Sequence, residues 1–271
     1  MKLHKILLVF LVFGLLSACK TNPFTGKRDL ALIPNSQLFP MAFQQYDEVL
    51  KESKVIRGTK EANMVNSVGD KIAEAARLYL KAEGVENYLK DYKWEYHLIQ
   101  SDQVNAWCMP GGKIAVYTGI LPITQTEAGL AAVMGHEVSH ALLNHGQRRM
   151  SQDQLTQLAS IAGSAAFENP KNAQLFDQAF GLGTQLGVAL PYSRKFEKQA
   201  DDLGVKLMAI AGYDPEAAVR LWERMSQAGG KQPIEFLSTH PSNQSRINNI
   251  SKQVDDAKTL ARKFGVTQFQ Q

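Results

Sequence analysis

The chain has 271 residues, of which 44% are hydrophobic and 21% charged, a composition typical of globular rather than disordered proteins. This length suits one large domain or two small ones. The formal charge is +4, of which Lys2 and Lys5 supply two, and so weak and scattered a charge argues against a nucleic-acid partner.

The first 18 residues are typical of a targeting segment. Lys2 and Lys5 precede an apolar run, Ile6–Leu16, whose eleven residues are too few to span a membrane comfortably. Leu16-Ser-Ala-Cys19 resembles the cleavage box of bacterial lipoproteins, with Cys19 as the lipidated first mature residue. Residue 20 is not the aspartate of the inner-membrane retention signal. The resemblance implies an outer-membrane lipoprotein that faces the periplasm of a Gram-negative bacterium; the alternative is a plain secretory signal.

Polar and apolar patterns divide the first half of the mature chain. Residues 20–34 are polar and contain Pro23, Gly26 and Pro34, so we expect a tether there, within a lipid-anchored segment 19–35. Residues 93–99 alternate polar and apolar side chains, which predicts a half-buried strand. The predicted elements are helices Ser36–Glu52 and Lys60–Leu80, followed by strands Lys93–Ile99, Val104–Met109 and Lys113–Thr118.

The second half of the chain is predicted to be helical. Thr126 and Glu127 form a plausible helix start ahead of a stretch that runs to about residue 144. Asp214-Pro215 opens a later helix, because aspartate caps well and proline suits the first helical position. The further predicted helices are Ser151–Phe167, Asn172–Leu190, Arg194–Ala211, Glu216–Gln227 and Pro241–Lys263, and Gly229–Thr239 is predicted to be a loop.

The helix that begins near Thr126 carries His136-Glu137-x-x-His140, a two-histidine zinc-protease signature. Residues four apart lie about 40° apart around a helix, so both imidazoles face the same way and can bind one Zn²⁺. Glu137 lies beside this pair rather than within it, which suits a general base that acts on water. The alternative is a surface helix that carries two histidines by chance.

A third metal ligand has to come from elsewhere in the chain. Some zinc peptidases carry a third histidine six residues after the second, but that position is Gly146 in this chain. His145 does not replace it, because it is expected to lie about 140° away from His140 around the helix. Downstream, Glu197 and Asp201 are four apart on one predicted helix. Glu197 can complete a His₂Glu site, and Asp201 can accept the outer N–H of a ligand imidazole. The alternative is an ordinary charged helix.

Three motifs in this order resemble the HtpX-like and CaaX-endopeptidase-type family of zinc metallopeptidases, the gluzincins. They are His136-Glu-Val-Ser-His140, Glu197-x-x-x-Asp201 and His240-Pro-x-x-x-x-Arg246. Asn105-Ala-Trp-Cys-Met-Pro-Gly-Gly112 resembles a further stretch of that family. The resemblance covers residues from about 22 to about 250, and within the family the chain is similar to its small periplasmic lipoprotein members.

We therefore predict an α+β, mostly α fold, a zincin-type metallopeptidase with a small mixed β-sheet beside the motif helix. Residues 1–18 are assigned to the signal peptide, 19–35 to the tether and 36–271 to the metallopeptidase domain. The strand at Asn105, Ala106 and Trp107 should form the edge of the sheet, where it can bind an extended peptide. The irregular piece with Gly181, Gly183 and Gly187 is either close to the metal or kinked for packing.

The predicted function is that of an endopeptidase with one Zn²⁺ per chain, held by His136, His140 and Glu197, with Glu137 as the base. The resemblance implies misfolded or unassembled cell-envelope proteins as substrates. The alternative is a periplasmic chaperone or assembly scaffold with a latent or structural zinc site.

His240 and Arg246 carry open roles at this stage. His240 can occupy the fourth zinc position and keep the enzyme latent, or stabilise an oxyanion, or act as a cap ahead of a helix, although Ser242 can cap there. Arg246 can steer a carboxylate, pair with an acid or form a surface salt bridge.

Overall fold

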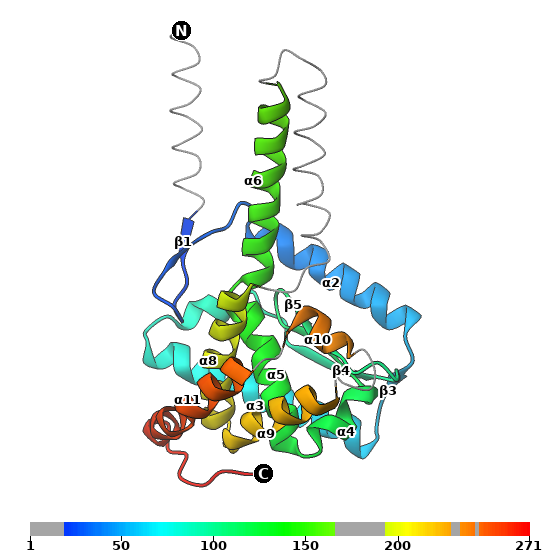
Figure 1. Ribbon diagram of the computed structural model, residues 1–271, viewed down its shortest axis with the longest axis vertical. Coiled ribbons are helices and arrows are strands. Elements are labelled where there is room, and N and C mark those ends of the chain that lie inside the picture. The colour runs from blue at the N-terminus through cyan, green and yellow to red at the C-terminus, as the bar shows by residue number, and fades with distance from the viewer. Residues whose placement is uncertain (1–18, 166–192, 229–233, 242–243) are drawn as a thin grey trace.

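A computed structural model describes residues 19–165, 193–228, 234–241 and 244–271 (Figure 1). The described chain is mostly helical with a small mixed sheet, which confirms the predicted fold class. The N-terminal strands are β1 (Cys19–Thr21) and β2 (Arg28–Leu30), and the sheet strands are β3 (Val55–Ile56), β4 (Glu95–Ile99), β5 (Ala106–Met109) and β6 (Lys113–Tyr117). The helices are α2 (Asn35–Glu52), α3 (Lys60–Ala82), α4 (Leu121–Thr124), α5 (Glu127–Leu142), α6 (His145–Ala165), α8 (Arg194–Ile210), α9 (Glu216–Ala228), α10 (Glu235–Thr239) and α11 (Gln244–Lys263), with 3₁₀ turns η1 (Glu86–Leu89) and η2 (Thr118–Ile120).

The four-stranded sheet has the order β3-β4-β6-β5. β4 and β6 run parallel, whereas β3 pairs with β4 and β5 with β6 in antiparallel fashion. β5 is therefore an edge strand, as predicted for the stretch at Ala106. Along β6, Ile114 and Val116 join the main core, whereas Ala115 packs beneath Tyr46 of α2. This alternation places α2 on one face of the sheet and α3 and α5 on the other.

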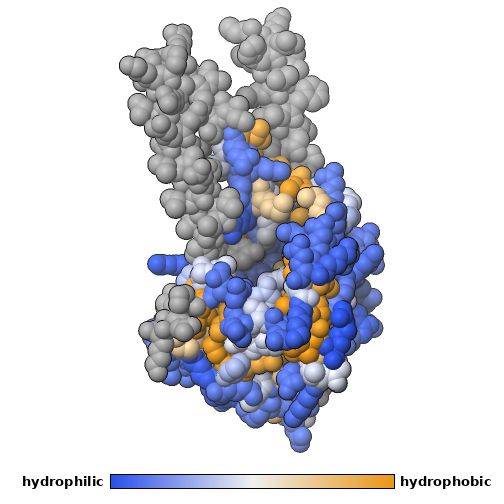
Figure 2. All heavy atoms as spheres, turned by 90° about the vertical axis from the view of Figure 1, so that its right-hand side faces the viewer, coloured by the Kyte–Doolittle hydropathy of each residue, from blue (hydrophilic) through white to orange (hydrophobic). Residues whose placement is uncertain are grey.

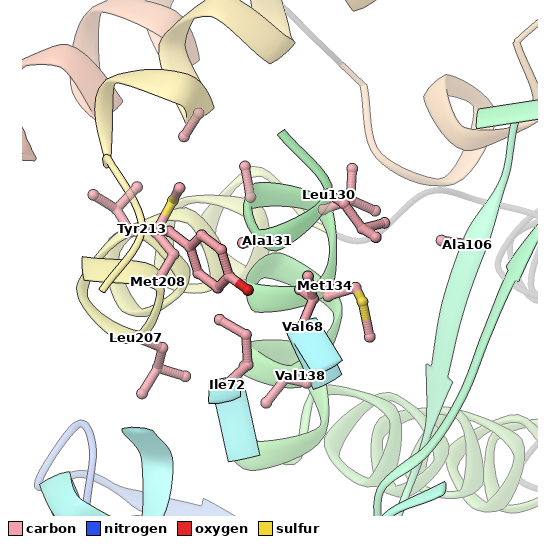
Figure 3. Close-up of a cluster of buried hydrophobic side chains, with 14 of the residues drawn as sticks. Val68, Ile72, Ala106, Leu130, Ala131, Met134, Val138, Leu207, Met208 and Tyr213 are labelled. Carbon is pink, nitrogen blue, oxygen red and sulfur yellow. The ribbon is translucent and has the colours of Figure 1, made fainter. Parts of the chain in front are cut away.

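The main core lies where α3, α5 and α8 meet (Figure 3). α5 carries apolar or small residues around almost its whole circumference, and every residue from Ala128 to Leu142 is buried. A helix that is apolar all round belongs in the interior. Side chains that fill this core include Val68 and Ile72 of α3, Leu130, Met134 and Val138 of α5, and Leu207 and Met208 of α8.

α5 and α8 cross in direct backbone contact. A Cβ atom on Gly204 would lie 3.0 Å from the backbone carbon of Gly135 and 3.0 Å from the nitrogen of His136. A Cβ atom on Gly135 would lie 3.0 Å from the carbonyl oxygen of Gly204. The two glycines therefore let the helix axes approach closely just where each helix carries the predicted metal-site residues.

The N-terminal part of the described chain is more ordered than the predicted tether. β1 and β2 form an antiparallel hairpin whose turn begins at Asn22. The Asn22 side chain is buried, and its Nδ2 donates to the carbonyl oxygen of Leu142 at the end of α5 (2.9 Å). A polar sequence gave no sign of this packing, because the partner lies 120 residues away. The hairpin satisfies one of the carbonyl groups that a helix leaves unpaired at its C-terminus.

Two predicted boundaries differ from the observed ones. α6 begins at His145 rather than Ser151, directly after Asn144, whose φ of 54° turns the chain between two helices. The predicted loop Gly229–Thr239 contains the short helix α10, which is fixed to the sheet by a bond from the Phe236 nitrogen to the Val104 oxygen (3.1 Å). The predicted helix Asn172–Leu190, the signal peptide 1–18 and Ser242 lie outside the described residues.

The surface of the described part is largely polar. Figure 2 shows one face on which hydrophilic residues predominate and apolar ones form patches between them. Large apolar side chains that are exposed in the described residues are few: Met41, Leu78, Val85 and Leu158. α6 extends away from the body (Figure 1), and no helix in the described ranges is long and apolar enough to cross a membrane.

The close crossing of α5 and α8 predicts the effect of Gly204→Ala. Alanine should raise helix propensity by about 1 kcal/mol, but overpacking against rigid backbone costs about 1–3 kcal/mol. We expect the second effect to prevail, because backbone atoms of Gly135 and His136 cannot rotate away. Urea unfolding should show a lower free energy of unfolding for Gly204→Ala than for Lys206→Ala on the same helix. Equal free energies of unfolding would mean that the two helices can accommodate a methyl group at their crossing.

Candidate metal centre

The motif helix α5 presents two imidazoles to one point. Thr126 caps this helix as predicted, its side chain accepting from the Gly129 nitrogen (3.1 Å). His136 and His140 are buried, and their Nε2 atoms lie 3.1 Å apart. Two bare ring nitrogens repel each other at that distance, so the pair requires a proton or a cation between them.

α8 brings a carboxylate to the same point. Ser193 caps this helix by accepting from the Phe196 nitrogen, and Glu197 follows in the first turn. Glu197 is buried, with Oε2 3.5 Å from His136 Nε2 and Oε1 3.4 Å from His140 Nε2. The structure therefore joins the three residues predicted as metal ligands, which are 61 residues apart along the chain at their extremes.

A fourth group, His240, belongs to the same buried cluster. It follows α10, and its Nδ1 lies 3.2 Å from His136 Nε2 and 3.1 Å from Glu197 Oε1. Its Nε2 lies 3.4 Å from Oε1 of Glu137. One ligand atom from each of His136, His140, Glu197 and His240 lies within 4.8 Å of the others.

This cluster fits a zinc ion. Tetrahedral zinc binds four ligand atoms, and imidazole nitrogen and carboxylate oxygen at about 2.0–2.2 Å are suitable ones. Donor atoms around such an ion are separated by about 3.3 Å, close to the 3.1–3.5 Å separations in this cluster. Calcium and magnesium prefer sets of oxygen ligands, which this imidazole-rich cluster does not offer.

Asp201 and Arg246 surround the ligands. Asp201 Oδ1 lies 2.9 Å from His136 Nδ1, the ring nitrogen that faces away from the cluster. Arg246 donates to both oxygens of Asp201 (2.7 and 2.8 Å), and its Nη1 lies 2.8 Å from Glu197 Oε2. The guanidinium also stacks 3.8 Å over the Trp222 ring. Arg246 is thus buried and pairs with acids, one of the roles left open by the sequence, and is not part of a surface salt bridge.

Burial and contact set the protonation of the cluster. Burial alone would lower the pKa of His136, but contacts with Asp201 and Glu197 raise it to about 9. Burial alone would raise the pKa of Glu197, but three imidazoles hold it well below its usual range. Burial raises the pKa of the Glu137 carboxyl above its usual range. Glu197 is therefore a carboxylate ready for a cation, and Glu137 is a stronger base than an exposed glutamate.

A sequence model of peptidase family M48 matches residues 60–254. The chain belongs to this family. The matched stretch contains all four residues of the cluster together with Glu137, Asp201 and Arg246.

The relatives named here belong to two groups. The mitochondrial metalloendopeptidase OMA1 of Schizosaccharomyces pombe is 38% identical over 172 residues, which are 63% of this chain and 49% of that protein. OMA1 of Saccharomyces cerevisiae is 32% identical over 210 residues, 72% and 56% of the two chains. The beta-barrel assembly-enhancing protease of Escherichia coli is 25% identical over 174 residues, 62% and 36%. The chain spans about half the length of the mitochondrial relatives just given.

The predicted location is wrong. The relatives of higher identity are mitochondrial proteins, which points away from a Gram-negative outer-membrane lipoprotein. That prediction rested on Leu16–Cys19 and on the residue that follows, and so short a pattern is independent of the M48 domain. Cys19 itself begins β1, and its lipidation stays a prediction.

One residue of the centre escaped the sequence reasoning. The sequence predicts that His145 lies away from His140, because a continued helix would turn it to another side. α5, however, ends before His145, which begins α6. Its Nδ1 lies 3.0 Å from Nδ1 of His140. Burial and the nearby Arg148 lower the pKa of His145 to about 3, so its ring is neutral. Asn144 after the motif was the available signal, because asparagine tolerates the left-handed conformation that ends a helix.

The raised pKa of His136 predicts that zinc binding is proton-linked. Below pH 9 the metal-free protein holds a proton at His136, which zinc must displace, so the observed affinity should rise about tenfold per pH unit up to about pH 9. In the metal-free protein the same proton stabilises the fold below pH 6.5, and this contribution is lost as the pH rises through about 9.

Calorimetry in two buffers of different ionisation enthalpy counts the released proton, and chelator competition gives the affinity at each pH. Asp201→Asn is the control, because without the carboxylate the proton at His136 is held less firmly and the pH dependence should weaken. A zinc affinity that is flat between pH 6.5 and 9 in the parent protein would contradict a protonated His136.

Proposed function

We propose that this chain is a zinc-dependent endopeptidase. The observation that carries the proposal is the convergence of His136, His140 and Glu197 on one buried point beside the carboxylate of Glu137. The membership of family M48 and the names of the metalloendopeptidase relatives support it. Zinc, when bound, supplies a Lewis acid that polarises a peptide carbonyl and makes water easier to deprotonate.

The protein's own residues supply the rest of the chemistry. Glu137 Oε1 is buried and has no hydrogen-bond partner among the described residues, although His240 lies 3.4 Å away. We infer that this carboxylate takes the proton from the attacking water and returns it to the leaving amine. Its raised pKa suits both transfers, because a general acid–base group works best near the ambient pH.

We infer that the edge strand β5 holds the substrate. The Tyr117 nitrogen donates to the Asn105 oxygen (3.0 Å), so Asn105 and Trp107 point their backbone groups toward β6. Ala106 and Cys108 therefore point theirs outward, where an added strand can pair with them. The side chain of Asn105 accepts from the Ala106 nitrogen (2.9 Å) and thereby satisfies one of these groups. A small cavity lined by Cys108, Pro110 and His140 adjoins both β5 and the cluster.

Such binding favours misfolded or unassembled proteins as substrates. Main-chain pairing needs an extended segment, which a compact fold does not offer, and it selects little for sequence. The beta-barrel assembly-enhancing proteases among the relatives are named for an assembly process. We propose no restriction to cell-envelope proteins, because that expectation depended on a location that is wrong.

His240 supports a latent resting state within this proposal. Its Nδ1 lies among the candidate ligand atoms, where a neutral imidazole would serve as a fourth zinc ligand and would leave no position for substrate. The same observation favours the second candidate function, a chaperone or assembly scaffold with a closed structural zinc site. The two differ in whether Glu137 matters for function.

Glu137→Gln should keep zinc, since Glu137 is not among the ligand atoms, but should lower turnover by about 10²–10⁴-fold. Cleavage of unfolded casein, with and without chelator, gives the rate, and elemental analysis gives the zinc content. Glu127→Gln, at the start of the same helix, is the control and should cut at the parental rate. A Glu137→Gln protein that keeps full function in cells would favour the scaffold.

His240→Ala separates the roles of that residue by sign. If His240 fills the fourth position, the variant should cut casein faster than the parent and bind zinc more weakly. If it stabilises the oxyanion instead, turnover should fall about a hundredfold with zinc retained. Unchanged turnover and unchanged zinc affinity would leave His240 as a structural residue.

A further inference from the structure

His145 is buried at the first position of α6, between the motif helix and α8. Its Nδ1 lies 3.0 Å from Nδ1 of His140, and its Nε2 lies 3.2 Å from Oε1 of Gln199. The ring stacks on Phe196, with centroids 4.3 Å apart and planes 5° from parallel. Gln199 and Phe196 belong to the helix that supplies Glu197, so His145 is held by one ligand-bearing helix and touches a ligand on the other.

The hydrogen bonds around His145 have a direction. Gln199 Oε1 is an acceptor, so His145 Nε2 carries a hydrogen. A neutral imidazole with a hydrogen on Nε2 has a bare Nδ1, which accepts from Nδ1–H of His140. His140 is then left with a bare Nε2, the atom that lies 3.1 Å from Nε2 of His136. The reverse direction would place a hydrogen on His140 Nε2 and exclude a metal ion.

The two metal-site histidines are supported by different chemistry. His136 faces the carboxylate of Asp201, which also favours a proton on that ring. His140 faces a neutral ring, which fixes its tautomer without adding a fourth carboxylate to a buried site that already holds Glu137, Glu197 and Asp201. A neutral imidazole in this position thus costs less desolvation free energy than a further buried carboxylate would.

We propose that His145, held by Gln199, is a positioning residue that fixes His140 in the tautomer and ring orientation required for metal binding. The proposal rests on the metal site of the proposed function but not on its peptidase activity. Groups that orient a metal-bound histidine contribute about 10–100-fold to metal affinity.

His145→Phe tests the proposal, because phenylalanine keeps the stack on Phe196 and removes the acceptor. Its zinc affinity, from competition with a chromophoric chelator, should fall about 10–100-fold. The Nδ1–H signal of His140 in ¹⁵N-edited NMR of the zinc-loaded protein should broaden, because that proton then exchanges with solvent. Gln199→Leu, which leaves His145 in place, should shift both readouts in the same direction by less. His97→Phe is the control, because His97 is a partly buried histidine that lies outside the centre, with its Nδ1 bonded to the Tyr46 hydroxyl (3.1 Å).

Parental zinc affinity and an unchanged His140 signal in His145→Phe would overturn the proposal. If that variant does not fold, Gln199→Leu decides, and parental values there would overturn it equally. Loss of affinity in the His97 control to the same extent would also overturn it, since the effect would then be one of general stability. A parent protein that binds zinc but cuts no peptide would refute the endopeptidase and leave this test intact.

Discussion

The contact between Gly135 and Gly204 is the constraint on which the site depends. His136 directly follows the first glycine, and Asp201 stands one helical turn before the second. Because the backbones approach closely at this crossing, side chains from the two helices can reach the same point. A Cβ atom at either glycine would lie 3.0 Å from backbone atoms of the facing helix, so we expect a side chain there to separate the helices that carry the metal-site residues. The position of the site is therefore set by residues that carry no chemistry.

The close crossing also gathers charged side chains that are buried. Glu137, Glu197 and Asp201 are all buried there, and burying unpaired carboxylates costs several kcal/mol each. Arg246 offsets part of this cost, because its planar guanidinium contacts both Glu197 and Asp201 and stacks on Trp222. The remaining negative charge favours a proton at His136 or a divalent cation. Metal binding at this centre is thus coupled to the stability of the fold, because a bound cation offsets the buried negative charge.

The sequence predicted those parts of the site that repeat with the helical period. His136 with His140, and Glu197 with Asp201, follow the four-residue spacing, and α5 and α8 place them as expected. The position of His145 was missed because it depends on a single left-handed residue between two helices. The N-terminal hairpin and α10 were missed because long-range bonds, to Leu142 and Val104, hold them in place. Local sequence patterns do not predict bonds between residues so far apart in the chain.

One such bond joins the predicted substrate strand to His240. The Val104 oxygen, just before β5, accepts from the Phe236 nitrogen in α10, and His240 caps the end of that five-residue helix. The His240 nitrogen in turn donates to the Phe236 oxygen (2.9 Å), so Phe236 is bonded on both sides. Withdrawal of His240 from the ligand atoms therefore requires either a rotation within these few residues or a shift of α10 relative to β5. If a peptide pairs with β5, as we propose, it binds beside Val104, whose oxygen holds α10 in place, and through α10 it can change the position of His240.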